Sequence, residues 1–292
     1  MKKEKSGIIF VLIAGILWGT MGVFVNYFNS VGLGSVECAW LRLVVAAVLV
    51  SLYILIKDAK LFSIKARDLW CFLGSGILSL MIFTVCYFRT IILSSMSVAA
   101  VLLYTSPIFV IILSMIFFKE KLTKIKALSA ILCVIGCAFV TGIVGSDTKI
   151  SILALLLGVS SGFAYALYSI FSRFALEKGY KSITITTYTF IFACLGLTPF
   201  IDINAVTGGI SSLTGVIIMI LSGLVTAVLP YLFYTQGLER IEGSKASVVA
   251  AIEPVVATIL GGIIFKDNLS FVQYSGIVIV IFSIVLLNMK KR

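Results

Sequence analysis

The stretch Ser106-Pro107-Ile108-Phe109 has a counterpart in Glu253-Pro254-Val255-Val256, and apolar runs of equal length follow both. The first run ends in Phe118-Lys119-Glu120-Lys121-Leu122 and the second in Phe265-Lys266-Asp267-Asn268-Leu269. The two prolines are 254 − 107 = 147 residues apart in a chain of 292 residues. The same spacing, without a gap, pairs Gly15 with Gly162, Phe24 with Phe171, Gly76 with Gly223, Tyr87 with Tyr234 and Ser97 with Ser244. These pairs indicate an internal duplication.

The composition indicates an integral membrane protein. Hydrophobic residues make up 61% of the chain and charged residues 12%, and the mean hydropathy is +1.18. Soluble domains are roughly 45–50% apolar, and a soluble chain of this length has too little interior to hide the excess. The net charge of +11 would suggest nucleic acid in a soluble protein. In a membrane protein it reflects orientation, so we expect no nucleic-acid partner.

Ten apolar runs, each about as long as the bilayer core requires, alternate with short polar segments. They cover residues 7–29, 36–56, 69–91, 95–118, 127–145, 151–173, 182–201, 215–238, 244–265 and 271–289. Five runs belong to each copy, at residues 1–145 and 151–292, and an odd number places the second copy upside down. The sequence therefore predicts an all-α membrane protein of ten transmembrane helices in two inverted five-helix repeats.

The distribution of basic residues predicts the orientation in the membrane. With the N-terminus inside, 19 of the 23 Lys and Arg residues fall in inside segments. Lys149 and Lys266 fall outside, and the long outside loop at residues 202–214 has no Lys or Arg. Basic residues collect on cytoplasmic loops. We therefore expect a multi-pass protein of the cytoplasmic membrane with both termini in the cytoplasm.

Several chemistries are disfavoured by what the sequence lacks. It contains no histidine, and its six cysteines show no CxxC spacing, so we expect no metal site, no cofactor and no enzyme. No GxxxxGK[ST] motif is present for ATP hydrolysis. Uphill movement of a solute would have to use an ion or solute gradient.

Glu253 is the acidic residue that lies near the middle of an apolar run. An ionised carboxylate at mid-membrane costs about 2.5–3.5 kcal/mol on insertion scales, so a proton, a cation or hydrogen bonds must compensate. We predict that Glu253 binds the positive group of a substrate and couples transport to protons. The alternative is a structural role, either capping backbone freed by Pro254 or pairing with Arg42.

Three prolines and one arginine are predicted to shape or gate the helices. Pro107, Pro230 and Pro254 each delete a helix hydrogen bond near mid-membrane, and the freed carbonyls can face a cavity. Kinks at matching positions of two copies are typical of transporter sites, although packing alone can also use them. Arg42, about two turns into its run, either binds a carboxylate or extends to the interface.

Aromatic and hydroxyl side chains recur at similar depth in several runs. Buried Tyr and Trp require hydrogen-bond partners, and residues near mid-membrane cannot all belong to an interfacial belt. As a set they predict a lining for an organic solute, whereas each alone fits an ordinary aromatic core. The predicted substrate-binding residues, besides Glu253, are Trp18, Tyr87, Tyr104, Ser106, Tyr165, Tyr168, Tyr231 and Tyr234.

The motifs resemble the EamA-type repeat of the drug/metabolite transporter superfamily. The resemblance covers the whole chain and rests on Gly15-Ile16-Leu17-Trp18-Gly19, Arg42, Ser106-Pro107, Ala250-Ala251-Ile252-Glu253-Pro254 and the two run ends at residues 118–122 and 265–269. One departure is that Lys119 and Lys266 stand where the family usually has glycine before the acidic residue. The departure bears on helix termination more than on substrate.

The resemblance implies a ten-helix basket that works by alternating access. It places Trp18, Tyr104, Ser106, Tyr165, Tyr231 and Glu253 near a central site. The function predicted is secondary transport, in the export direction, of a small metabolite such as an amino acid or amine. The alternative is a lipid-linked flippase or a lipid-headgroup-binding protein. The expected partners are a small solute, the bilayer and protons, in a monomer or homodimer.

Overall fold

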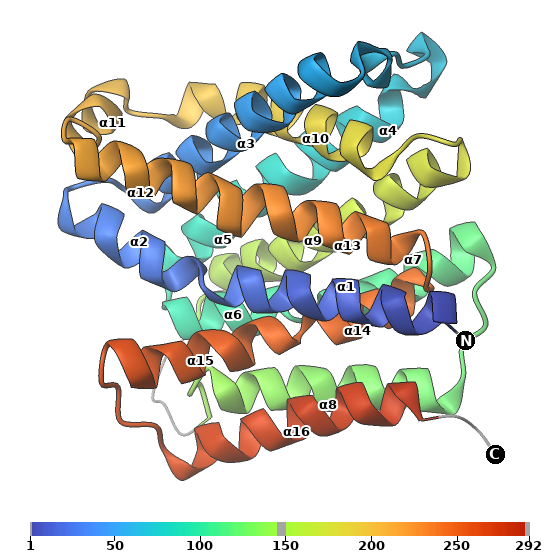
Figure 1. Cartoon of the computed structure of the whole chain (residues 1–292). Coiled ribbons are helices and arrows are strands. Elements are labelled where there is room, and N and C mark those ends of the chain that lie inside the picture. Colours follow the sequence, from blue (N-terminus) through green and yellow to red (C-terminus); the bar gives the residue numbers. More distant parts are fainter. Residues whose placement is uncertain (1, 145–149, 290–292) are drawn as a thin grey trace.

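The computed structural model describes residues 2–144 and 150–289, and every regular element in this part of the chain is a helix (Figure 1). The prediction of an all-α membrane protein is confirmed. The helices of the first copy are α1 (Lys2–Gly19), α2 (Met21–Ser30), α3 (Ser35–Lys57), α4 (Leu69–Leu73), the π-helix η3 (Gly74–Met81), α5 (Ile82–Leu93), α6 (Met96–Leu103), α7 (Ser106–Phe118) and α8 (Lys124–Val140).

The second copy repeats this order with fewer interruptions. Its elements are α9 (Ile152–Glu177), α10 (Ser182–Leu197), the short α11 (Ile203–Gly209), α12 (Leu213–Gly223), the π-helix η5 (Leu224–Val228), α13 (Leu229–Leu238), α14 (Gly243–Ala250), α15 (Ile252–Ile264) and α16 (Phe271–Asn288). Nine helical segments in the described part are long and apolar enough to span a membrane. The tenth predicted span is α8, which has 17 residues and packs along α16 at one edge of the molecule (Figure 1).

The two copies share local irregularities at equivalent positions. The fourth span breaks between Leu103 and Ser106, and the ninth breaks between Ala250 and Ile252. Pro107 and Pro254 therefore lie in the first turn of a new helix, where a missing N–H costs little. The third and eighth spans both pass through a π-helix before α5 and α13. Pro230 directly follows the second of these π-helices.

Glycines let equivalent helices approach closely in both copies. A Cβ added to Gly15 would lie 2.9 Å from the Ala250 carbonyl oxygen, and one added to Gly162 would lie 3.1 Å from the Leu103 oxygen. The first and sixth spans thus pack on the helix breaks of the ninth and fourth spans. Small residues permit such contacts between membrane helices, where the packed surfaces supply the attraction.

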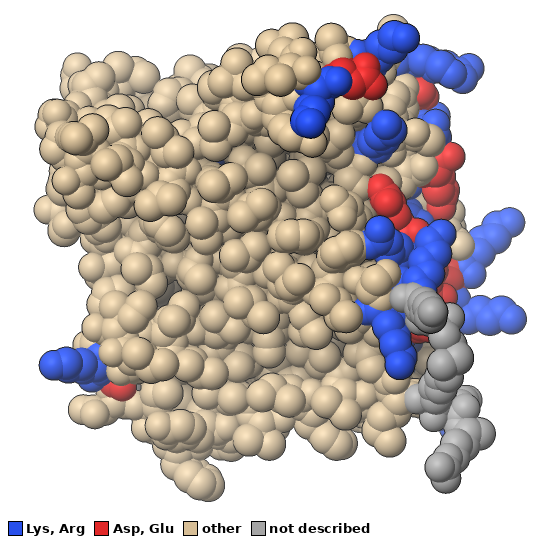
Figure 2. All heavy atoms as spheres, in the orientation of Figure 1, with Lys and Arg blue, Asp and Glu red and all other residues tan. Residues whose placement is uncertain are grey.

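Charged side chains gather at one end of the helix bundle, here called the basic end. The start of α1 and the end of α16 lie there (Figure 1), and most Lys, Arg, Asp and Glu atoms in view cluster over it (Figure 2). A small charged group marks the opposite end, and the face in view carries almost no charged side chain between the two ends (Figure 2). Lys149 and the C-terminal residues 290–292, which the sequence-based orientation also used, lie outside the described residues.

Candidate functional site

A central cavity of about 520 Å³ lies among the first, second, third, fourth and ninth spans. Its volume falls within the roughly 300–1,000 Å³ of small-molecule sites. Its deep part is lined by Trp18, Arg42, Tyr104 and Glu253. Its mouth is lined by residues of the loops and helix ends at the end opposite the basic end, including Ser35, Ser97, Asp267 and Gln273. The cavity is therefore accessible from one end of the bundle.

The cavity contains some of the predicted site residues and not others. Trp18, Arg42, Tyr87, Tyr104, Glu253 and Pro254 line it. Seven predicted residues do not line it, and these are Ser106, Pro107, Tyr165, Tyr168, Pro230, Tyr231 and Tyr234. Sequence reasoning missed Phe83, Phe88 and Gln273, which do line it. A signal for Phe83 was available, because it lies four residues before Tyr87 and so shares its helix face.

Several of the remaining predicted tyrosines form an aromatic floor beneath the cavity. The Trp18 ring lies 5.1 Å from the Tyr231 ring and 5.5 Å from the Tyr234 ring, measured between centroids. Tyr168 packs edge-on against Tyr231 at 4.9 Å, and Phe190 does so at 5.3 Å. Edge-to-face contacts of this kind stabilise aromatic clusters. The floor separates the cavity from the basic end.

Two charged groups of opposite sign enclose the deepest part of the cavity. Glu253 lies in the first turn of α15, where the helix dipole favours a negative charge. The Tyr104 and Tyr165 side chains are neighbours of its carboxyl. Arg42 is 8% exposed and donates one hydrogen bond to the Met21 sulfur. Its Nε has no partner in the described residues, so the guanidinium retains an unused donor.

Hydrogen bonds close the bundle below the floor, between the sixth and eighth spans. The Tyr168 and Thr235 hydroxyls are 2.7 Å apart, and so are those of Ser169 and Tyr234. The equivalent positions of the first copy, 147 residues earlier, are Met21, Gly22, Tyr87 and Phe88, and all four line the cavity. The sixth and eighth spans are therefore joined at the basic end, whereas the equivalent first and third spans are apart at the other end.

The family model described as the EamA-like transporter family matches the chain twice, over residues 5–142 and 152–289. The chain belongs to this family. The family's members are transporters. The earlier prediction of EamA membership is thus confirmed.

Relatives support the same class of protein. An "Uncharacterized transporter" of Archaeoglobus fulgidus is 28% identical over 94% of this chain and 95% of its own. The "Uncharacterized inner membrane transporter YicL" of Salmonella typhimurium is 25% identical over all of this chain and 98% of its own. A solved structure with 13% identity superposes with a TM-score of 0.80 over 97% of this chain and 96% of its own, which supports the fold alone. The protein is a multi-pass membrane transporter.

Proposed function

We propose that this transporter exports a small metabolite that carries both an ammonium and a carboxylate group, such as an amino acid. The observation that carries the proposal is the presence of two charged groups, the partly buried Glu253 and the buried Arg42, in one aromatic cavity. The described residues form no ion pair between them, so each is available to a solute. The unpartnered Nε of Arg42 suits a carboxylate, which guanidinium binds bidentately.

The remaining lining suits the apolar part of such a solute. Trp18, Phe83, Tyr87 and Tyr104 present ring surfaces around the charged pair. A solute ammonium beside Glu253 would also contact these rings through cation–π attraction. A proton on Glu253 would take the place of the ammonium once the solute has left, which couples export to proton entry.

Alternating access follows from the inverted arrangement of the copies. We infer that the basic end is cytoplasmic, because Lys and Arg collect on that side of membrane proteins. The cavity then opens to the outside. Rocking of one copy against the other would close this mouth and open the basic end, with the solute held near mid-membrane.

The test begins with a thermal-shift panel of leucine, phenylalanine and the amines formed by removing their carboxyl groups. Hits are then measured by counterflow in proteoliposomes. We expect the amino acids to bind and the amines to bind at least about tenfold more weakly, because Arg42 loses its partner. The Glu253→Gln variant should lose the pH dependence of transport and most of the flux.

The matched control is Glu37→Gln, since Glu37 lies on α3 outside the cavity lining. It should transport as the unaltered protein does. Equal flux by Glu253→Gln and the unaltered protein at every pH would contradict the assigned role. Movement of a labelled lipid, with no flux of any water-soluble solute, would favour the flippase alternative instead.

A further inference from the structure

Glu120 follows α7 at the basic end and caps a helix of the other copy. Its Oε1 accepts a hydrogen bond from the Gly243 amide at 3.0 Å. Its Oε2 accepts from the Ser244 amide at 3.4 Å and from the Ser244 hydroxyl at 2.5 Å. These amides open α14, where no acceptor exists within the helix itself. We call this set of contacts, between Glu120 and residues 243–244, the clasp.

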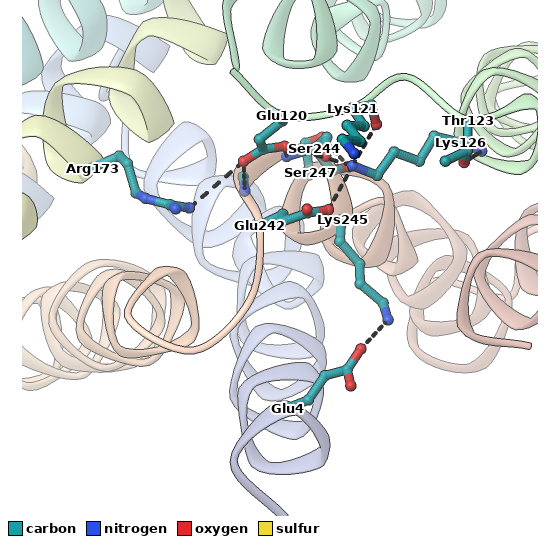
Figure 3. Close-up of polar contacts among 11 residues, drawn as sticks. Glu4, Glu120, Lys121, Thr123, Lys126, Arg173, Glu242, Ser244, Lys245 and Ser247 are labelled. Carbon is teal, nitrogen blue, oxygen red and sulfur yellow. Dashed lines mark hydrogen bonds and ion pairs between the residues drawn. The ribbon is translucent and has the colours of Figure 1, made fainter. Parts of the chain in front are cut away.

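Two cations complete the clasp (Figure 3). The Arg173 guanidinium lies 3.6 Å from Oε1 of Glu120, and Lys126 Nζ lies 3.9 Å from Oε2. The Glu120 side chain is only 5% exposed. Charge-assisted hydrogen bonds are the strong ones, and a buried carboxylate that loses them is left at a large cost. The clasp therefore holds α14 against α7 and keeps the basic end shut.

The residue equivalent to Glu120 in the second copy is Asp267, and its backbone is arranged in the same way. Lys119 and Lys266, which precede them, both adopt left-handed φ values, of 54° and 59°. The Glu120 amide donates to the Ser114 carbonyl at 3.2 Å, and the Asp267 amide donates to Gly261 at 3.4 Å. The two acids thus leave equivalent helix ends in the same direction.

The surroundings of Asp267 differ, because its side chain makes no contacts equivalent to those of Glu120 in the clasp. Asp267 is exposed at the cavity mouth, and its carboxylate has no hydrogen bond or ion pair in the described part of the chain. The positions equivalent to Gly243 and Ser244 are Met96 and Ser97, which open α6 and also line the mouth. Ser95 caps only the Val98 amide, at 3.2 Å. Within the part of the chain that the structure describes, the Met96 and Ser97 amides have no acceptor.

We propose that Glu120 and Asp267 close the two ends of the transporter in turn, each by capping the facing helix of the other copy. Asp267 would accept from the Met96 and Ser97 amides and the Ser97 hydroxyl as Glu120 releases α14. The inference rests on the proposed alternating access and assigns its two closing contacts to named residues.

The clasp at the basic end is the stronger of the two, which explains why the cavity opens at the other end. The equivalents of Arg173 and Lys126 are Asn26 and Gln273, which carry no charge. Asp267 would therefore close its end without the cations that surround Glu120. The resting equilibrium favours the state in which Glu120 is engaged.

The test measures exposure at two repeat-equivalent positions, Ala100 and Ser247, in the full chain with its six native cysteines replaced. Ala100 lines the cavity, and Ser247 lies on α14 behind the clasp, 8% exposed. A membrane-impermeant maleimide is applied to Ala100→Cys or Ser247→Cys protein from the corresponding side of oriented vesicles. Glu120→Gln should raise Ser247→Cys labelling by about fivefold to thirtyfold and lower that of Ala100→Cys. Adding Asp267→Asn should restore Ala100→Cys labelling.

Asn26→Arg provides the opposite test, because it adds the missing cation beside Asp267. It should lower Ala100→Cys labelling, and Asp267→Asn should cancel the effect. Glu242→Gln is the matched control, since Glu242 pairs with Lys126 at 2.5 Å but caps no amide. It should leave both labelling rates unchanged.

Unfolding is distinguished from opening because it would raise labelling at both positions. If Glu120→Gln unfolds the chain, Ser244→Ala removes only the hydroxyl of the clasp and should shift the labelling in the same direction. Unchanged labelling in Ser244→Ala and Asn26→Arg protein would overturn the proposal. The readout needs no solute, so shifted labelling without any transport would refute the proposed function and leave the clasp standing.

Discussion

The two ends of this molecule are built from equivalent helices of the two copies, but these helices are packed together at one end and stand apart at the other. At the basic end, Tyr168 and Ser169 are hydrogen-bonded to Thr235 and Tyr234, and α14 packs against α7. At the other end the equivalent spans stand apart around the cavity, and α6 and α15 are barely in contact. Since the copies share their backbone irregularities, the difference is one of state and not of architecture. Under the proposed alternating access, each end would take the arrangement of the other during transport.

The contacts that both ends share should be the least tolerant of change. Gly15→Leu and Gly162→Leu place a side chain where even a Cβ would lie 2.5 Å from Ile252 and 2.7 Å from the Leu102 carbonyl oxygen. Overpacking against backbone should cost about 3 kcal/mol or more in either variant. Thermal unfolding in detergent measures the loss.

The control for this pair is Gly22→Leu. An added Cβ at Gly22 would meet nothing within 4 Å, because this glycine faces the cavity. That variant should melt as the unaltered protein does. Strong destabilisation at only one of Gly15 and Gly162 would mean that the two ends do not share this interface.

A repeat-equivalent pair of tyrosines tests where the ends differ. Tyr234 shares a hydrogen bond with Ser169 at the closed end, whereas the Tyr87 hydroxyl has none in the described residues. Tyr234→Phe should lower the free energy of unfolding by about 1 kcal/mol, and Tyr87→Phe should leave it near its original value. Equal melting temperatures for the two variants would show that the hydrogen bond between Tyr234 and Ser169 does not stabilise the closed end.

The smallest effect is expected at the two left-handed lysines. Lys119→Gly and Lys266→Gly each relieve a backbone conformation that costs a residue with a Cβ roughly 1–2 kcal/mol, partly offset by the flexibility of glycine. Each should raise the free energy of unfolding by up to about 1 kcal/mol. Lys119→Ala keeps the Cβ and should give no gain in the same melting experiment. A gain from alanine would point to charge instead of backbone conformation.

The fold follows from the sequence because the bilayer imposes it. The lengths of the apolar runs predicted the ends of most spans to within a few residues, as for the ninth span, which was predicted at 244–265 and is observed at Gly243–Ile264. The fifth span was placed less well, at 127–145 against Lys124–Val140. Thr123 caps the Lys126 amide at its start, and Gly142 turns the chain at φ 72° beyond its end. Such local polar contacts outweigh apolar length at helix ends.

The site was predictable only in part, because a duplicated sequence does not record which end is open. Trp18, Tyr104 and Glu253 lie at mid-depth and reach the cavity. Tyr168 and Tyr231 have the same chemical character but lie within the sealed half. Their assignment to substrate binding stays a prediction for the state that opens toward the basic end. The boundaries at 1–145 and 151–292, the termini's orientation and the coupling ion also stay predictions.

The π-helices at Gly74–Met81 and Leu224–Val228 give the third and eighth spans a property that an unbroken α-helix lacks. A π turn holds more residues than an α turn, so each span contains extra residues relative to a regular α-helix of the same length. Shifting the hydrogen-bond ladder by one residue there would turn α5 or α13 by about 100° while the chain remained helical. Such a shift would let α5, which lines the cavity, and its counterpart α13 rotate about their own axes without leaving the membrane or exposing their backbone.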